Sequence, residues 1–518
     1  MGRQLASGCT SAQLTAMLGL HEKGLLRQAP VFGQEAHTFL WLMLASGGDP
    51  RIWLDPVTRR NRYGMKTTPA PDELSFASTT ANTISAQGYA AAALAAGGLF
   101  PSGRALHLPL SQWFDEIRAS VVNGLGVPGA EAVLAASGTD AEILAVALAT
   151  GLAPRPLTNI LIAPEETGSG VPLAAAGRHF SDCTALGVPV AAGSPIEGLA
   201  LRGIEIVFVP IRDASGRARD PAAVDEEATA AVERELRKGR DVLLHVLDTS
   251  KTGLAGLTRE AARFLMASAP GRVRVAVDAC QLRCRLTQVK RDLEDGFMVI
   301  ATGSKFAGGP PFCAVVLLPA ALAAEIAAGP PLPRGLASYS AALDWPAALR
   351  DRSGDMALSH SNSGLGLRWA AALDGIETMA GFSAESETAI ASRFASEVRA
   401  RAQTLSGVVL HEDDALCACN TIVPLTVLDR NGAFAALSGA QKLHAALREA
   451  EHAPICHVGQ AVRLGARTVL RVAASAYTVA GVAACMGGGL DRAFRSVACD
   501  LDSLFEKWSF IERQRQSE

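Results

Sequence analysis

The chain of 518 residues has no run of about 18 uninterrupted apolar residues, the length that a membrane-spanning helix needs. Internal repeats and low-complexity tracts are also missing. Net charge is small, because 48 Lys and Arg residues stand against 51 Asp and Glu residues, for a formal charge of −3 at pH 7. We therefore expect neither nucleic acid nor a membrane surface as a partner.

Paired cysteine motifs are missing too. The ten cysteines are scattered with no C-x-x-C spacing, which is typical of reduced thiols in a cytoplasmic enzyme. The segment after Met1 lacks the apolar core of a secretory signal, which also predicts a cytoplasmic location. His411, Cys417 and Cys419 cluster in the sequence, but their spacing matches no established ligand set, so no metal site is expected.

Three short segments carry the chemistry. Ser137-Gly138-Thr139 is a small-residue turn between an apolar run and an Ala-rich helical stretch. Further along, a buried strand ends at Asp278. Lys305 then follows another strand and precedes the chain-bending residues Gly308-Gly309-Pro310-Pro311. The order of the three segments indicates one site for pyridoxal 5′-phosphate.

Each residue type has a chemical reason. Lysine is the side chain whose primary amine can form and exchange an imine with a carbonyl cofactor, which predicts this role for Lys305. Asp278 would keep the pyridine nitrogen protonated, since two unit charges about 4 Å apart interact by roughly 4 kcal/mol at an effective dielectric near 20. The turn at Ser137 offers hydroxyls, backbone N–H groups and a helix start to the phosphate.

With these motifs, the chain resembles fold-type I pyridoxal-phosphate enzymes, and within them the class V aminotransferase and cysteine desulfurase branch. The likeness runs, more faintly, from about residue 75 to about residue 485. It implies that Gln281 lies near the ring hydroxyl and that Thr302 or Ser304 joins the phosphate site. It also implies that Ser250 lies on a loop near the cofactor ring. Lys251 in that loop is a rival to Lys305 but lacks the flanking Ser/Thr and Gly-Pro residues.

Two further roles follow from the resemblance. Arg471, inside a predicted strand, would bind the substrate carboxylate through its fork of donors, with a structural ion pair as the alternative. His360 and Ser361 resemble a loop that reaches the phosphate of the partner subunit, which implies a homodimer with shared active sites. A segment rich in Ser, Thr and Asn at 78–83 is expected to face the substrate.

Short β-rich runs separated by helices predict an α/β fold with a mostly parallel, doubly wound sheet of the seven-stranded type in a large domain, and a smaller α+β C-terminal domain. The strands are expected at 133–136, 160–163, 204–210, 242–247, 273–278, 299–301 and 314–318, with two more at 421–427 and 468–473. The expected division is an N-terminal extension (1–75), a cofactor-binding domain (76–335), connecting helices (336–403) and a small domain (404–518). Gly124-Leu-Gly126-Val-Pro-Gly129 follows a helical run, so it is interpreted as a helix end rather than a dinucleotide site.

The chain departs from the family pattern at two places. Where the family has a histidine stacked on the cofactor ring, this chain has Glu165 and Glu166, which could instead meet the substrate. Cys456 lies near the position of the mobile desulfurase cysteine but without its small-residue loop, so a buried thiol is expected. We therefore expect a pyridoxal-phosphate enzyme acting on an amino acid or amine, with aminotransferase chemistry first. A lyase or replacement enzyme, including desulfurase-like C–S chemistry, is the alternative, and a non-catalytic homologue is disfavoured.

Overall fold

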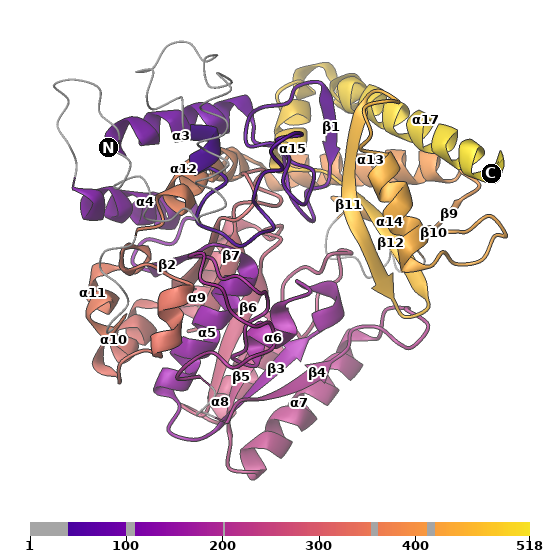
Figure 1. Cartoon of the computed structure of the whole chain (residues 1–518). Helices are drawn as coiled ribbons and strands as arrows, with labels where there is room; N and C mark the ends of the chain where they lie inside the picture. Colours follow the sequence, from indigo (N-terminus) through magenta and orange to yellow (C-terminus); the bar gives the residue numbers. More distant parts are fainter. Residues whose placement is uncertain (1–39, 100–108, 200–202, 354–360, 412–419, 518) are drawn as a thin grey trace.

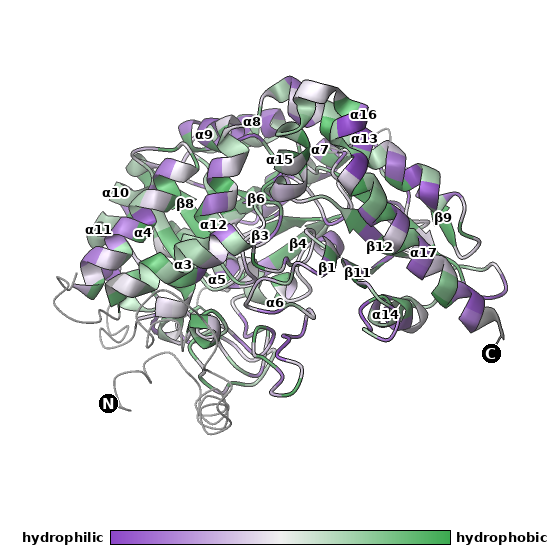
Figure 2. Cartoon of the chain, turned by 90° about the horizontal axis from the view of Figure 1, so that it is seen from above, coloured by the Kyte–Doolittle hydropathy of each residue, from purple (hydrophilic) through white to green (hydrophobic). Residues whose placement is uncertain are grey.

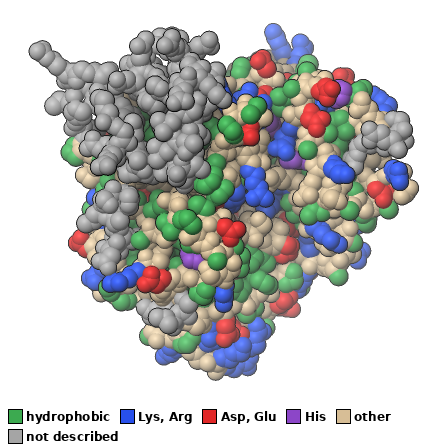
Figure 3. Space-filling model, viewed as in Figure 1, with side chains coloured by type: hydrophobic (Ala, Val, Ile, Leu, Met, Phe, Trp, Pro, Cys, Tyr) green, Lys and Arg blue, Asp and Glu red, His purple; other side chains and the backbone are tan. Residues whose placement is uncertain are grey.

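A computed structural model describes residues 40–99, 109–199, 203–353, 361–411 and 420–517. Two β-sheets with helices around them make up this part of the chain (Figure 1). Acidic and basic side chains are interspersed over much of the face in Figure 3, in keeping with the small net charge. Among the described residues, no helix combines the length and the apolar character needed to cross a membrane.

The large sheet has seven strands in the order β2-β8-β7-β6-β5-β3-β4. Neighbouring strands pair in parallel except at β8, which is antiparallel to both β7 and β2. The strands are β2 (Glu131–Ala135), β3 (Leu157–Ile162), β4 (Glu205–Val209), β5 (Asp241–Leu247), β6 (Val273–Ala279), β7 (Met298–Thr302) and β8 (Ala314–Leu318). All seven predicted strand positions are confirmed.

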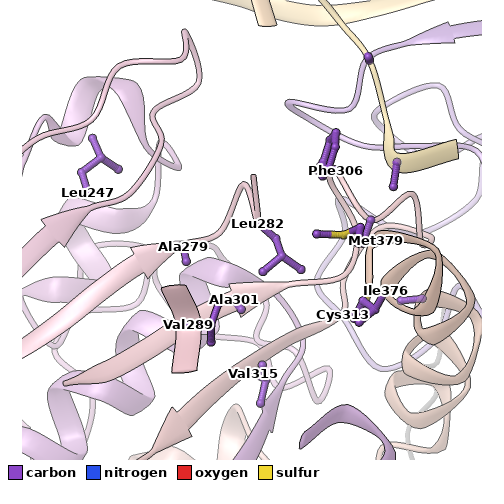
Figure 4. Packing of buried hydrophobic residues seen from close by; sticks show 14 of the residues in the cluster. Leu247, Ala279, Leu282, Val289, Ala301, Phe306, Cys313, Val315, Ile376 and Met379 are labelled. Carbon is purple, nitrogen blue, oxygen red and sulfur yellow. The ribbon is translucent and has the colours of Figure 1, made fainter. Parts of the chain in front are cut away.

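Both faces of this sheet are covered, because alternate residues of one strand belong to different cores. In β6, Val275 and Val277 join one hydrophobic cluster, and Ala276 between them joins the other. Figure 4 shows the first cluster, where Ala301 of β7 and Val289 of α9 take part. The helices of this region are α4 (Leu110–Gly124), α5 (Gly138–Leu152), α6 (Val171–Ala175), α7 (Pro221–Arg237), α8 (Arg259–Ser268), α9 (Leu286–Glu294), α10 (Ala320–Ala328) and α11 (Ala347–Arg350), with 3₁₀ turns at Pro164–Glu166, Arg334–Ser338, Ala342–Asp344 and Asp351–Ser353.

Peripheral helices have one face in the core. In Figure 2 helices such as α4 and α17 carry hydrophilic and hydrophobic residues on different sides. Helix α4 ends at Gly124, and β2 begins at Glu131, so the glycine-rich segment between them is the helix end that the sequence predicted. The remaining helices are α3 (Ala86–Leu99), α12 (Ser363–Ala380), α13 (Ala384–Ala402), α14 (Leu437–Ala446), α15 (Ala476–Ala483), α16 (Leu490–Ala493) and α17 (Arg495–Ser517), with a 3₁₀ turn at Met486–Gly488.

The small sheet has five strands in the order β1-β11-β12-β10-β9. Sequence patterns predicted only β10 (Ile422–Val427) and β12 (Arg467–Ala473); β9 (Val408–Leu410) and β11 (Ile455–Leu464) were not anticipated. Its edge strand β1 (Glu73–Phe76) comes from the N-terminal part of the chain and pairs with β11 in parallel, beside it in Figure 1. The expected boundary after residue 75 therefore falls inside a strand of the C-terminal sheet.

Strand order brings the predicted site residues to one edge. Leu247 at the end of β5 lies opposite Asp278 of β6, and Asp278 lies opposite Ile300 of β7. β2 runs in the same direction as β7, because each is antiparallel to β8. The segments that follow β2, β5, β6 and β7 therefore start from the same edge of the sheet, where α/β proteins bind ligands.

Candidate active site

A cavity of about 230 Å³ opens at this edge. Most of the predicted cofactor residues line it. These are Ser137, Gly138, Thr139, Asp278, Gln281, Thr302, Ser304 and Lys305. The structure thus brings the three sequence motifs to one cavity wall.

The turn after β2 begins helix α5. The Ser137 hydroxyl accepts a hydrogen bond from the Asp140 N–H (3.3 Å) and so caps the helix. A Cβ added at Gly138 would lie 2.7 Å from the Cys280 sulfur, so glycine is needed where this turn meets the end of β6. The first N–H groups of a helix have no hydrogen-bond partner inside the helix, and they lie at the positive end of the helix dipole. This turn can therefore bind an anion in the cavity.

Asp278 lies near the end of β6, where one carboxylate oxygen accepts the Cys280 N–H (3.0 Å). Behind it, His245 lies 3.3 Å from the Glu142 carboxylate. Although burial alone would lower the pKa of His245, the carboxylates of Glu142 and Asp278 raise it overall. The Glu142 carboxylate also accepts from the Asn159 amide (3.0 Å). The Asp278 carboxylate thus lies close enough to this buried polar group for its charge to act on His245.

Lys305 follows β7 in a tightly held turn. The Asn82 side-chain amide donates to the backbone carbonyl of Ser304 (3.1 Å) and to that of Lys305. Gly308 has φ = +81°, and a Cβ there would lie 2.4 Å from the Tyr477 ring. The backbone of this turn is thus fixed on both sides. Within the described part of the chain, the Lys305 amine makes no hydrogen bond and is available to a ligand.

Some polar atoms of the neighbouring residues already have hydrogen-bond partners in the protein, and others do not. Thr302 donates its hydroxyl to the Cys280 carbonyl (2.6 Å). Gln281 donates its amide N–H to the Thr79 carbonyl (3.1 Å), while its amide oxygen is buried without a partner. A buried acceptor without a donor is costly, so it favours a ligand that brings one.

Lys251 lines the same cavity as Lys305. Burial, together with the nearby charges of Arg471 and Lys305, lowers the pKa of Lys251 to about 7. The site therefore contains two amines, and only Lys305 has the sequence context expected for the cofactor.

Glu166, which stands where the sequence resemblance led us to expect a ring-stacking histidine, belongs to a buried ion pair. Glu166 lines the cavity, and its carboxylate pairs with Arg212 and accepts from the Ser250 hydroxyl (2.5 Å) and from Thr252. Glu165 beside it is exposed. Because Glu166 already has these partners, it has little capacity left for a substrate.

The structure does not bring every predicted residue to the cavity wall. Ser250 is turned away toward Glu166. Ser361 is buried beside Ser363, with 3.4 Å between the hydroxyl oxygens, and His360 lies outside the described residues. Arg471 is completely buried one layer behind the wall, where one of its N–H groups reaches the Thr80 hydroxyl at 3.4 Å.

Arg471 is unusual because its Nε and Nη1 atoms are buried without a hydrogen-bond partner. Burial lowers the pKa of Arg471 to about 9, and the Glu166 charge offsets part of this effect. Among the described residues Arg471 forms no ion pair, which was the alternative role, and its hydrogen-bond partner is the Thr80 hydroxyl. A ligand carboxylate would relieve the cost of this unpaired charge.

Cys456 lies in β11, fully buried and away from the cavity wall. Burial raises the pKa of its thiol to about 11. A buried, protonated thiol is a poor nucleophile. The expectation of a buried thiol at this position is confirmed.

Part of the cavity wall was missed by sequence analysis. Arg51, Arg62 and Tyr63 of the N-terminal segment line it, together with Thr79 and Thr80. Only the last two fall in the Ser/Thr/Asn-rich stretch that was expected to face a substrate. The sequence near Arg51 offers only a weak indication of this role, the Gly47-Gly48 pair, where the absence of side chains lets the backbone pack closely against Asn362 and Phe312.

Comparisons with known proteins agree on the fold. No family model matches the chain, and no curated protein matches it either. Solved structures do. The cysteine desulfurase CsdA from Escherichia coli aligns over 85% of this chain and 94% of its own, with a TM-score of 0.51 and 14% identity. The chain shares the CsdA fold. A NifS-like protein aligns over 85% of this chain and 99% of its own, with a TM-score of 0.50 and 13% identity. The predicted α/β fold of type I is thereby confirmed.

Proposed function

We propose that the chain is a pyridoxal 5′-phosphate-dependent enzyme that acts on an amino acid or an amine. One observation carries this proposal: a lysine, a carboxylate and an anion-binding helix start, each after a different strand, line one cavity. The Gly138 cradle and the unpartnered Gln281 oxygen fit a flat, phosphorylated ligand.

Each side chain has a defined task in this proposal. Ser137, Gly138 and Thr139 bind the phosphate, with Thr302 and Ser304 beside them. Asp278 would pair with the ring nitrogen and favour its protonated form. When bound, the cofactor withdraws electrons from the substrate Cα. Lys305 holds the cofactor and then moves a proton at Cα, for which its unpaired amine is suited.

Aminotransferase-type chemistry is the preferred reaction. An amino-acid substrate and a keto-acid partner both carry a carboxylate, and Arg471, whose Nε and Nη1 lack hydrogen-bond partners among the described residues, supports the binding of that group from behind Thr80. The reaction requires no thiol, which agrees with the burial of Cys456. The alternative is a lyase or replacement enzyme that breaks a bond at Cα, Cβ or Cγ. It would use the same cofactor residues and would differ in which substrate bond stands perpendicular to the cofactor ring.

A homodimer with shared sites belongs to this proposal. Its support is the sequence resemblance at His360 and Ser361. Ser361 precedes α12, whose start packs against the N-terminal segment next to the cavity: a Cβ at Gly364 would lie 2.5 Å from the Met43 carbonyl. Sedimentation velocity at several concentrations would test the dimer.

Trapping the cofactor tests the central assignment. After incubation with pyridoxal 5′-phosphate, borohydride reduction and peptide mapping should find the pyridoxyl group on Lys305. A label on Lys251, which lines the same cavity, would contradict the assignment. Lys305→Ala should lose the label, and Lys251→Ala should keep it.

A second experiment separates the two reaction classes. Amino acids are supplied to the loaded enzyme with and without a keto acid, and products are identified by mass spectrometry. An aminotransferase turns over repeatedly only with the keto acid. Sustained release of ammonia without it would replace the aminotransferase by the lyase.

A further inference from the structure

The N-terminal segment forms part of the cavity wall beside the phosphate-binding turn. Arg51 and Tyr63 of this segment line the same cavity as Ser137-Gly138-Thr139, and Arg51 reaches the Ser137 hydroxyl at 3.3 Å. We propose that Arg51 binds the cofactor phosphate and so completes the anion site from the same chain. This inference rests on the proposed cofactor and adds to it a role for the N-terminal segment.

Arg368 of α12 holds this segment in place. It is fully buried, and its guanidinium donates to the backbone carbonyls of Leu44 (3.2 Å), Ser46 and Gly47 (3.0 Å). The same group donates to the Phe312 carbonyl (2.5 Å), in the loop that follows Lys305. One side chain thus ties the N-terminal segment to the loop beside the cofactor lysine.

Two glycines allow the close approach. A Cβ on Gly47, which has φ = +66°, would lie 1.8 Å from the Asn362 side-chain oxygen, and one on Gly48 would lie 2.9 Å from the Phe312 ring. The Asn362 amide also donates to the Gly47 carbonyl (3.0 Å). The position of Arg51, three residues further on, is therefore set by the fold.

The Arg51 side chain is aimed at the turn. Its guanidinium lies over the rings of Phe312 and Phe180, 4.8 and 5.2 Å from the centroids. The buried Asp49 carboxylate accepts from Nε (2.9 Å) and Nη2 (2.6 Å), which fixes the orientation of the fork. Nη2 then reaches the Ser137 hydroxyl at 3.3 Å. Nη1 takes part in none of these hydrogen bonds, and Tyr63, which also lines the cavity, hydrogen-bonds to the guanidinium. A phosphate would share this edge of Arg51 with the Tyr63 hydroxyl.

The negative charges around the Ser137 turn make a cation such as Arg51 necessary for phosphate binding. Asp49 and Asp140 are both buried beside it. Burial and the nearby Asp49 charge raise the pKa of Asp140 to about 7. Without Arg51, a dianionic phosphate would bind next to these two carboxylates with only helix N–H groups to offset them. The Arg51 guanidinium supplies a positive charge here, and because its Nε and Nη2 are held by Asp49, it would meet a phosphate oxygen through Nη1.

The test compares two ligands that differ only in the phosphate. Apo-enzyme is titrated with pyridoxal 5′-phosphate and with pyridoxal, following absorbance. Variants are Arg51→Gln and the pair Asp49→Asn/Arg51→Gln. The pair also removes the Asp49 charge that Arg51 neutralises, in case the single variant folds poorly. Arg60→Ala is the matched control, because Arg60 lies in the same segment and pairs with Glu73 (2.6 Å) away from the cavity.

We expect the Arg51 variants to bind pyridoxal 5′-phosphate roughly 10- to 100-fold more weakly, as for loss of a charge-assisted hydrogen bond, and to bind pyridoxal unchanged. Arg60→Ala should keep the wild-type ratio of the two affinities. Equal weakening of both ligands in the Arg51 variants, or no weakening, overturns the role of Arg51 while the proposed function stands. A wild-type protein that binds neither ligand overturns the proposed function and this inference together.

Discussion

Replacing Gly138 by Ala tests the phosphate-binding turn with a single methyl group. The added Cβ would lie 2.7 Å from the Cys280 sulfur, well inside van der Waals contact. Overpacking of this kind costs about 1–3 kcal/mol. The apo-protein can relieve the clash by moving the first turn of α5, so the cost falls mainly on cofactor binding. At about 1.4 kcal/mol per factor of ten, affinity for pyridoxal 5′-phosphate should fall roughly 5- to 150-fold in an absorbance titration.

The structure also supplies a rescue and a control. In Gly138→Ala/Cys280→Ala the nearest neighbour becomes a Thr302 methyl group at 3.6 Å, an ordinary contact, so affinity should return to that of Cys280→Ala. Gly151 lies in the same helix with no atom within 4 Å of an added Cβ. Gly151→Ala should therefore leave binding unchanged and stabilise the helix by up to about 1 kcal/mol. A double variant as weak as Gly138→Ala would refute the steric argument.

Three other outcomes are expected. Asp278→Ala should keep the borohydride label on Lys305 but lose most turnover in a steady-state assay, because protonation of the ring nitrogen is no longer favoured. Near-normal turnover would show that Asp278 does not pair with the ring nitrogen. Cys456→Ala should change turnover less than twofold and destabilise the fold by about 1 kcal/mol in urea unfolding, as for a small buried cavity; abolished sulfur transfer would instead indicate a desulfurase. Between pH 7 and 10.5 Lys251 is protonated in the unfolded chain but neutral in the folded chain. Its unfavourable contribution to the free energy of unfolding therefore grows as the pH falls from 10.5 to 7. Lys251→Met should therefore stabilise the apo-protein by up to a few kcal/mol at pH 7 and by less at pH 9.5, and an equal gain at both would contradict the lowered pKa.

The seven strands of the large sheet were predictable because buried parallel strands appear as short β-rich runs between helices. The motif at Lys305 was predictable as well, since its chemistry depends on a local arrangement of residues. Strand β1 was not, because Glu73–Phe76 has only one buried residue and gains its pairing from β11. Arg51 was missed for a similar reason. Its position depends on Arg368, a residue far along the chain, whose guanidinium donates to backbone carbonyls of the N-terminal segment.

The parallel pair of β1 and β11 has a consequence for how the protein is made. Leu74 lies opposite Cys456, so β1 leaves the ribosome about 380 residues before its partner. At roughly 5–20 residues per second this is a delay of about 20–80 s. Thr80, which follows β1 and lines the cavity, accepts the Gln460 N–H of β11 (3.3 Å), so this wall also forms late. A nascent chain can thus build the parallel sheet with Asp278 and Lys305 before it can enclose a ligand. Retention of the cofactor would then mark a chain that has been synthesised beyond β11.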